Sequence, residues 1–240
     1  MTNKQDNTPA LYLFPVALGN APLDSVLPPA NIELLRDMRY LAVENLRSAR
    51  RFLKSADRSV VIDDITFYEL NEHTRPEDIP AMLKPLEEGH SMGILSEAGC
   101  PAIADPGADL VAAAQRRGFR VIPLVGPSSI LLSLMGSGFN GQSFAFQGYL
   151  PIDSDRRSRK LREMQQRVIK ERQTQIFIET PYRNNRLIAE LIRELPGDML
   201  LCVASDITGT NERIITRSLH QWSKTTLDYD KVPTIFLLYN

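Results

Sequence analysis

Two short loops hold the residues best suited to bind a small ligand. The first, residues 96–101, reads Ser-Glu-Ala-Gly-Cys-Pro and follows the apolar run 92–95. The second, residues 126–129, reads Gly-Pro-Ser-Ser, follows the apolar run 121–125 and opens a helix-like segment. Small residues let the backbone approach a ligand closely, and a helix start offers free N–H groups. Each loop alone is typical of a plain turn, but together, after two strands of one sheet, they indicate a ligand crevice.

Other common catalytic patterns are weak or missing. Residues 136–141 match G-x-G-x-x-G, but a helix-like run precedes them and a strand-like run follows. A dinucleotide fingerprint needs the opposite order, so we interpret these glycines as a helix stop and loop. The sequence has no Walker A motif and no G-x-S-x-G elbow, and its three histidines, His73, His90 and His220, lie far apart. We therefore expect no metal site.

The first half of the chain alternates between strand-like and helix-like segments. Helical segments separate the runs that we expect to form strands, which are residues 11–14, 40–43, 60–62, 92–95 and 121–125. Thr74 and Glu77 have the spacing of a capping box and predict a helix that runs to about Glu88. Asp105 before Pro106 predicts the start of another helix. Strands separated by single helices favour a mostly parallel sheet, in which ligands bind beyond the carboxyl ends of the strands.

The second half has fewer helices per strand. Residues 155–172 predict a charged helix, and residues 181–195 predict a second helix. Apolar runs at residues 175–178, 200–204, 213–219 and 234–239 predict strands of a mixed sheet. The fold class is therefore α/β, with an N-terminal domain at residues 1–125 and a C-terminal mixed α/β domain at residues 126–240.

Composition describes an ordinary globular chain. Its 240 residues carry 28 Lys and Arg against 29 Asp and Glu, a net charge of −1, with 43% hydrophobic residues. This balance gives no global reason to expect a nucleic-acid partner, although a local basic face is compatible with it. Only Cys100 and Cys202 are present, and the N-terminus lacks a signal-peptide core. Gly and Pro interrupt the charge-free run 121–152, so we expect no membrane segment and a cytoplasmic location.

Several stretches resemble one known family. The sequence reads LYLFPVALGN near its start, LSEAGCPAIADPGADL and VIPLVGPSS in its middle, and FAFQGYLP after them. These stretches resemble the tetrapyrrole methylase superfamily, and most closely its bacterial branch that methylates a ribose 2′-hydroxyl of small-subunit ribosomal RNA. The resemblance implies a methyltransferase that uses S-adenosylmethionine (SAM), a SAM cleft between two α/β domains, and a homodimer. It implies ribosomal RNA or the small ribosomal subunit as partner.

The resemblance also implies which residues bind SAM. By position, the first SAM loop falls at Leu18 and Gly19, the second at residues 96–100, and the third at the two serines that follow Pro127. A strand end in the second domain supplies a further candidate for the adenine pocket. The implied cofactor-binding residues are Leu18, Gly19, Ser96, Glu97, Gly99, Cys100, Ser128, Ser129 and Ile178.

The chain departs from the family pattern at polar positions expected to face the methyl acceptor. The family's A-E-D-T-R appears as Val-Glu-Asn-Leu-Arg at residues 43–47, and its R-E-L-T-K appears as Ser-Asp-Ile-Thr-Gly at residues 205–209. The family's aspartate in the second SAM loop is replaced by glutamate. The SAM loops are thus better preserved than the acceptor-facing residues. We expect substrate contacts from Arg47, Asn71, Glu179 and Arg183.

A hydroxyl acceptor benefits from a general base. We expect Glu44 or Glu72 to be this base and Glu97 to lie near SAM. The plain alternative is that Glu44 only pairs with Arg47, which lies one residue short of i,i+4 spacing. The two interpretations carry about equal weight.

Three functions stay open at this point. The first is methylation of ribosomal RNA, which the basic residues of the helix at 155–172 favour if they bind phosphates. Acidic residues are interleaved with them, so a solvated helix face explains the same pattern. The second is methylation of a tetrapyrrole or another small acceptor. The third is a SAM-binding or RNA-binding module without catalysis, which the changes at Asn45, Leu46 and Ser205 suggest.

Overall fold

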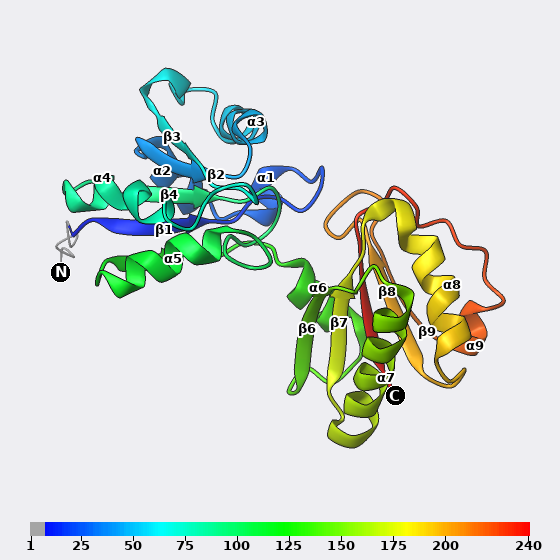
Figure 1. Cartoon of the computed structure of the whole chain (residues 1–240). Coiled ribbons are helices and arrows are strands. Elements are labelled where there is room, and N and C mark those ends of the chain that lie inside the picture. The colour runs from blue at the N-terminus through cyan, green and yellow to red at the C-terminus, as the bar shows by residue number, and fades with distance from the viewer. Residues whose placement is uncertain (1–7) are drawn as a thin grey trace. The chain divides into compact units, whose positions relative to one another are not determined.

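A computed structural model describes residues 8–240 of the chain. These residues form two compact units, which Figure 1 colours from blue to green and from green to red. Unit 1 contains the described residues up to Ala17 and the segment Ala21–Pro127. Unit 2 contains Leu18–Asn20 and Ser128–Asn240. The chain therefore leaves unit 1 for three residues and returns to it.

Unit 1 is built on a five-stranded sheet in which every pair of neighbours is parallel. The strand order is β3-β2-β4-β1-β5. This result confirms the prediction of a parallel sheet, and it places the carboxyl ends of all five strands at one edge. The strands are β1 (Ala10–Phe14), β2 (Tyr40–Val43), β3 (Thr66–Glu69), β4 (Met92–Leu95) and β5 (Arg120–Pro123).

Helices cover both faces of this sheet, as parallel strands require. On one face, α2 and α3 pack on alternate strand residues such as Phe14 and Leu41. On the other face, α5, α4 and the 3₁₀ helix Ile79–Leu83 pack on Leu13 and Ile94. The helices of unit 1 are α1 (Leu23–Val26), α2 (Pro29–Arg36), α3 (Leu46–Ala56), α4 (Lys84–Glu87) and α5 (Gly107–Arg116).

Two local predictions for unit 1 are wrong. Residues 60–62 form no strand: Val60 is a buried loop residue, and Ile62 begins a 3₁₀ turn. The third strand is β3, whose residues are half-buried or exposed, and sequence reasoning missed it because the apolar run 60–62 lies just before it. The capping box at Thr74 does not form either, since its hydroxyl accepts the Asn71 N–H instead. The expected helix is a 3₁₀ helix (Ile79–Leu83) followed by α4, because prolines interrupt this segment.

Unit 2 is built on a mixed five-stranded sheet, as predicted. Only β6 and β7 pair in parallel, and the other three pairs are antiparallel. The order β6-β7-β10-β8-β9 places β10 between β7 and β8. The carboxyl ends of β6, β7 and β8 therefore lie at one edge. The strands are β6 (Phe144–Tyr149), β7 (Thr174–Ile178), β8 (Leu200–Ser205), β9 (Arg213–Ser218) and β10 (Thr234–Tyr239).

The helices of unit 2 pack on opposite faces of this sheet. The helix α6 contributes Leu134 to a cluster with Ile176 and Cys202 on one face. On the other face, α7, α8 and α9 enclose a larger core around Phe177 and Trp222. The expected helices at residues 155–172 and 181–195 correspond to α7 and to a 3₁₀ turn followed by α8. The helices are α6 (Ser129–Ser137), α7 (Ser154–Glu171), α8 (Asn184–Glu194) and α9 (Leu219–Trp222).

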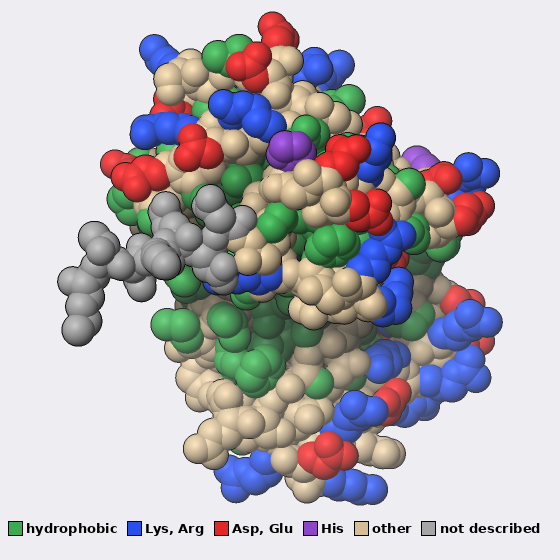
Figure 2. Space-filling view, turned by 90° about the vertical axis from the view of Figure 1, so that its left-hand side faces the viewer, with side chains coloured by type: hydrophobic (Ala, Val, Ile, Leu, Met, Phe, Trp, Pro, Cys, Tyr) green, Lys and Arg blue, Asp and Glu red, His purple; other side chains and the backbone are tan. Residues whose placement is uncertain are grey.

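The surface carries charges of both signs, as the balanced composition predicts, and the two cysteines form no disulfide. Figure 2 shows acidic and basic side chains interleaved over the face that it displays. Both cysteines are free, and burial raises the pKa of the Cys202 thiol to about 11. Within residues 8–240, no helix has the length and apolarity needed to cross a membrane.

Candidate functional site

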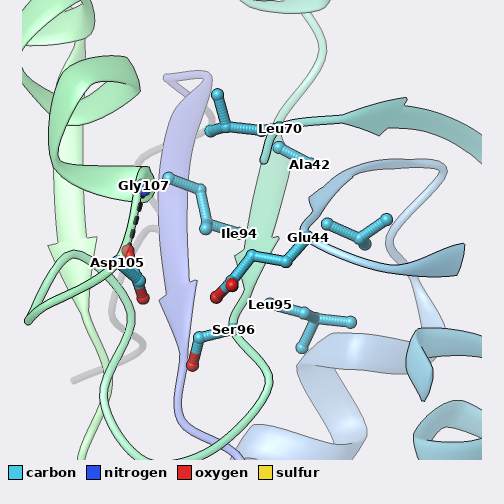
Figure 3. A pocket seen from close by; sticks show the side chains of 9 residues that line it. Ala42, Glu44, Leu70, Ile94, Leu95, Ser96, Asp105 and Gly107 are labelled. Carbon is cyan, nitrogen blue, oxygen red and sulfur yellow. Dashed lines mark hydrogen bonds between the residues drawn. The ribbon is translucent and has the colours of Figure 1, made fainter. Parts of the chain in front are cut away.

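A small hollow lies at the carboxyl edge of the parallel sheet in unit 1 (Figure 3). It is shallow and opens where β2 and β4 end, and the space between its side chains, including the part open to solvent, is about 160 Å³. Its walls are apolar toward the sheet and carry two carboxyl groups and one hydroxyl. The lining residues are Ala42, Val43, Glu44, Leu70, Ile94, Leu95, Ser96, Asp105 and Gly107.

Glu44 directly follows β2 and points into this hollow. Its Oε1 accepts the backbone N–H of Glu97 at 3.3 Å, which ties it to the second candidate SAM loop. Burial raises the pKa of the Glu44 carboxyl above its ordinary value, and the negative charges of Asp105 and Glu97 raise it further. Among residues 8–240, no ion pair joins Glu44 to Arg47. The structure therefore places the Glu44 side chain in the hollow and does not support the alternative that Glu44 only pairs with Arg47.

Asp105 faces Glu44 across the hollow, as Figure 3 shows. Its Oδ1 accepts two backbone N–H groups, from Ala102 at 2.9 Å and from Gly107 at 2.7 Å. Its Oδ2 is buried and has no hydrogen-bond partner within the described part of the chain. Burial raises the pKa of this carboxyl, while the two backbone N–H groups lower it. Sequence reasoning treated Asp105 only as a helix start and missed its place opposite Glu44.

The backbone between Ser96 and Asp105 is held in uncommon conformations. Ala102 and Ala104 have φ angles of 65° and 61°, in the left-handed region that residues with a Cβ seldom adopt. Such conformations persist only where surrounding contacts hold them, and they occur often at ligand sites. Here the Asp105 carboxylate supplies one of those contacts, through the Ala102 N–H.

The second candidate SAM loop is fixed at several points. Gly99 forms a two-way backbone bridge with Val16, at 2.8 and 3.0 Å. The Ser96 side chain is buried in the hollow, while Glu97 is exposed and accepts a hydrogen bond from the Ser48 hydroxyl at 3.0 Å. The Cys100 thiol donates to the carbonyl oxygen of Pro127 at 3.4 Å. These contacts bring the loop next to the 126–127 segment of unit 1, as the strand order predicts.

The backbone of Gly126 passes so close to Pro15 that a side chain would not fit. A Cβ atom built on Gly126 would lie 2.2 Å from the Cβ of Pro15. A glycine is therefore required where β5 leads into the third loop.

In unit 2, the candidates Leu18, Ser129 and Ile178 lie around one apolar cluster. Leu18 and Ile178 pack against this cluster beside α6, the helix that Ser129 begins. The hydroxyl of Ser128 caps the same helix by accepting the Leu131 N–H at 3.4 Å. Leu18 and Ile178 thus pack on the same apolar cluster as α6, the helix that Ser128 and Ser129 begin.

Next to these candidates runs the loop that follows β8. A Cβ on Gly19 would lie 3.6 Å from the Oδ1 of Asp206, so this glycine leaves a narrow space. The hydroxyl groups of Ser205 and Thr208 are buried and have no hydrogen-bond partner within residues 8–240. Buried polar groups are normally satisfied, so these two hydroxyls indicate a place for a polar ligand or water. Sequence reasoning had noted these positions only as departures from the family pattern.

The other candidates in unit 1 lie outside the hollow. The Glu72 side chain is 87% exposed on the loop after β3, where it pairs with His73. The amide of Asn71 stabilises the same turn by accepting the His73 N–H at 2.9 Å. Arg47 is exposed in the first turn of α3. The geometry therefore favours Glu44 over Glu72 as a base next to the second loop.

In unit 2, Glu179 and Arg183 form an ion pair at 2.8 Å. Both line a second pocket, whose other walls include Arg157 and Glu190. Sequence reasoning missed Arg157, because it lies within a run of basic residues that predicts a solvated face. Within the described residues, no group of three His, Cys, Asp or Glu side chains is arranged to hold a metal ion.

The comparisons with known proteins identify the family of the chain. The model of the tetrapyrrole (corrin/porphyrin) methylases matches residues 25–222, which is most of the chain. The chain belongs to the tetrapyrrole methylase family. As a member of this family it is a methyltransferase whose methyl donor is SAM.

Relatives within the family are named ribosomal RNA small subunit methyltransferase I. The protein from Vibrio cholerae is 31% identical over 209 residues, which cover 87% of this chain and 68% of the relative. The protein from Mesorhizobium japonicum is 32% identical over 211 residues, which cover 88% of this chain and 68% of that relative.

Solved structures agree on the tetrapyrrole methylase fold. The methyltransferase CobJ superimposes with a TM-score of 0.62 at 15% identity, over 96% of this chain and 93% of its own. Uroporphyrin-III C-methyl transferase from Thermus thermophilus, in complex with S-adenosylhomocysteine, gives a TM-score of 0.56 at 16% identity, over 97% of both chains. At these identities the likeness speaks for the fold alone.

Proposed function

We propose that this protein transfers the methyl group of SAM to a ribose 2′-hydroxyl of small-subunit ribosomal RNA, in the cytoplasm and as a homodimer. The observation that carries the proposal is the 31% identity, over 87% of the chain, to a relative named for methylation of small-subunit ribosomal RNA. The carboxyl-lined hollow in unit 1 supports it, because a hydroxyl acceptor needs a proton acceptor near the reacting oxygen.

Two groups of residues fit the donor. In unit 1, the backbone of Gly99 and the side chains of Ser96, Glu97 and Cys100 would hold it. In unit 2, the candidates are the Leu18–Gly19 segment, the start of α6 at Ser128 and Ser129, and Ile178 at the end of β7. The unpartnered hydroxyls of Ser205 and Thr208 and the narrow space at Gly19 fit a polar ligand beside this second group.

Glu44 acts as the general base in this proposal. When bound, SAM supplies a methyl group on a positively charged sulfur, which is a good leaving group. The acceptor oxygen forms the new bond to the methyl carbon as the bond from carbon to sulfur breaks, and the Glu44 carboxylate takes the hydroxyl proton. A raised pKa makes this carboxylate a stronger base than a free one. The protein otherwise aligns the two reactants and excludes water.

The substitution Glu44→Gln tests this role. Glutamine keeps the side-chain oxygen that accepts the Glu97 N–H but cannot take up a proton. We expect methyl transfer to undermethylated small ribosomal subunits, followed with tritiated SAM, to fall about 10²–10⁴-fold. Binding of SAM, measured by calorimetry, should stay within about twofold of the wild-type protein.

Two controls make this experiment decisive. Glu72→Gln, on the exposed loop after β3, should leave turnover unchanged. Glu44→Ala, which also removes the contact with Glu97, should weaken SAM binding. Wild-type turnover in Glu44→Gln would exclude Glu44 as the base. Transfer to a small molecule but never to ribosomal subunits would favour a tetrapyrrole-type acceptor. SAM binding without transfer to either acceptor would favour a non-catalytic module.

A further inference from the structure

A second pocket lies entirely within unit 2, where α7 and α8 begin. The space between its side chains, including the part that is open to solvent, is about 380 Å³. Five charged side chains line it, together with Ile152 and Leu187: Arg157, Glu179, Arg183, Arg186 and Glu190. We call it the arginine pocket. Three guanidinium groups face two carboxylates, so the lining carries one net positive charge.

Hydrogen bonds hold two guanidinium groups of this pocket in place, and all three groups keep N–H donors that have no partner within residues 8–240. Glu190 and two backbone carbonyls bind the Nε and Nη1 of Arg157, and Arg157 and Glu190 are 10% and 9% exposed. Thr180 and Glu179 bind the Nε and Nη2 of Arg183. Within residues 8–240, no hydrogen bond uses the Nη2 of Arg157, the Nη1 of Arg183 or any nitrogen of Arg186. The carboxylates thus orient two of the guanidinium groups and leave N–H donors for a ligand.

Large apolar side chains are exposed around this pocket. Ile152, in its wall, is 78% exposed. Tyr182, which directly precedes Arg183 in the chain, is 74% exposed. Proteins bind single-stranded RNA with exposed aromatic rings and guanidinium groups that lie close together.

We propose that the arginine pocket binds a backbone phosphate of the RNA acceptor, and that Tyr182 stacks on an unpaired base next to that phosphate. The inference rests on the proposed function, because it takes RNA as the acceptor. Guanidinium groups suit phosphate oxygens because they donate two parallel hydrogen bonds. Arg186 keeps its whole guanidinium group for such a contact, and Arg157 and Arg183, which their partners already fix, can each add a hydrogen bond from one remaining nitrogen.

The exposed face of α7 is less suited than the arginine pocket to bind a particular RNA phosphate. Its basic residues are more numerous, but Arg167 and Lys160 already pair with Glu163. Asp153 and Asp155 add negative charge at the start of the helix. Flexible, partly neutralised side chains of this kind contribute a general attraction rather than a fixed contact.

Arg186→Gln tests the arginine pocket, because this residue is exposed and makes no contact that the fold needs. The matched control is Arg162→Gln, which removes one exposed positive charge from α7 outside the pocket. The probe is a single-stranded RNA oligonucleotide, titrated at several salt concentrations. We expect Arg186→Gln to weaken binding about five- to tenfold and to reduce the salt slope by about 0.7, and Arg162→Gln to change affinity less than twofold. Tyr182→Ala should weaken binding at every salt concentration without changing the slope.

The outcomes separate this inference from the proposed function. Equal RNA affinity of Arg186→Gln and Arg162→Gln, or no RNA binding by the wild-type protein, would overturn it. A weaker affinity of Arg186→Gln for SAM would overturn it too, since it would assign the guanidinium groups to the cofactor's carboxylate. If RNA binding depends on Arg186 but ribosomal subunits are never methylated, the pocket stands and the proposed reaction fails.

Discussion

At the scale of single residues, the most informative side chain is Asp105. It holds the backbone at both ends of the strained segment 102–107 through one oxygen, and its other oxygen faces Glu44 without a partner. Two carboxyl groups that share a poorly solvated space do not both ionise easily. Asp105 is therefore a positioning residue, which acts on the reaction through the loop and through the protonation of Glu44.

Asp105→Asn separates these two effects. Asparagine keeps an oxygen for the Ala102 and Gly107 N–H groups but removes the negative charge that raises the pKa of Glu44. If activity needs ionised Glu44, the loss of activity on acidification should then occur at lower pH than in the wild-type protein. The measurement is the pH profile of kcat/KM from pH 5 to pH 8, with SAM affinity as a check on the loop. An unchanged profile with unchanged SAM affinity would show that the two carboxyl groups do not interact.

Residue types and spacing predicted part of this site. The small residues around Gly99 and the strand before them were sufficient to locate the second loop. The opposition of Glu44 and Asp105 was not predictable, because it depends on how β2 and α5 are placed around β4. The hydrogen bond from the Glu97 N–H to Glu44 joins residues 53 positions apart, and such a contact has no local pattern in the sequence. The unpartnered hydroxyls of Ser205 and Thr208 were hidden for the same reason.

At the scale of elements, strands with a continuous apolar run were predictable. The strands β1, β2 and β4 are almost wholly buried, and their continuous apolar runs identify them. The half-exposed strand β5 was predicted as well. The residues of β3 are half-buried or exposed in the same way, but the nearby apolar residues 60–62 gave a stronger and misleading signal. Tertiary contacts determine the conformation of residues 60–62, since Val60 is buried in the core without belonging to the sheet.

The pairing of α7 with α8 gives a prediction at this scale. Glu190 on α8 neutralises Arg157 on α7, and both side chains are nearly buried. Removing one partner leaves a charge that is poorly hydrated, so Glu190→Ala should lower the free energy of unfolding of unit 2 by about 3 kcal/mol. The chain has one tryptophan, Trp222, which is buried in unit 2. Its fluorescence during urea denaturation therefore reports on this unit.

The control is Glu163→Ala, which breaks the ion pairs with Arg167 and Lys160 along the exposed side of α7. These pairs are well hydrated, so their loss should cost less than about 1 kcal/mol. Equal effects of the two substitutions would mean that the Arg157–Glu190 pair stabilises unit 2 no more than a surface contact does.

At the scale of the whole molecule, the proposed homodimer leads to a measurable expectation. Figure 2 shows hydrophobic side chains gathered on part of the surface. Two exposed apolar residues, Leu131 at 51% and Met135 at 78%, lie one turn apart on α6. Light scattering coupled to size-exclusion chromatography should give twice the mass of the 27.0 kDa chain. If α6 forms the interface, Met135→Glu should shift the protein toward the monomer, whereas the exposed control Ile169→Glu on α7 should not.

The three residues Leu18–Asn20 give unit 2 an unusual order of assembly. They leave the ribosome early, yet Gly19 lies against Asp206 and Gly209, which are made near the end of synthesis. The strands of unit 1 are complete once Pro123 has been made, so this unit can fold while the chain is still growing. The first candidate SAM loop must wait until β8 and the loop after it exist. An unfinished chain can therefore hold a folded parallel sheet but not the full set of residues proposed to bind the methyl donor.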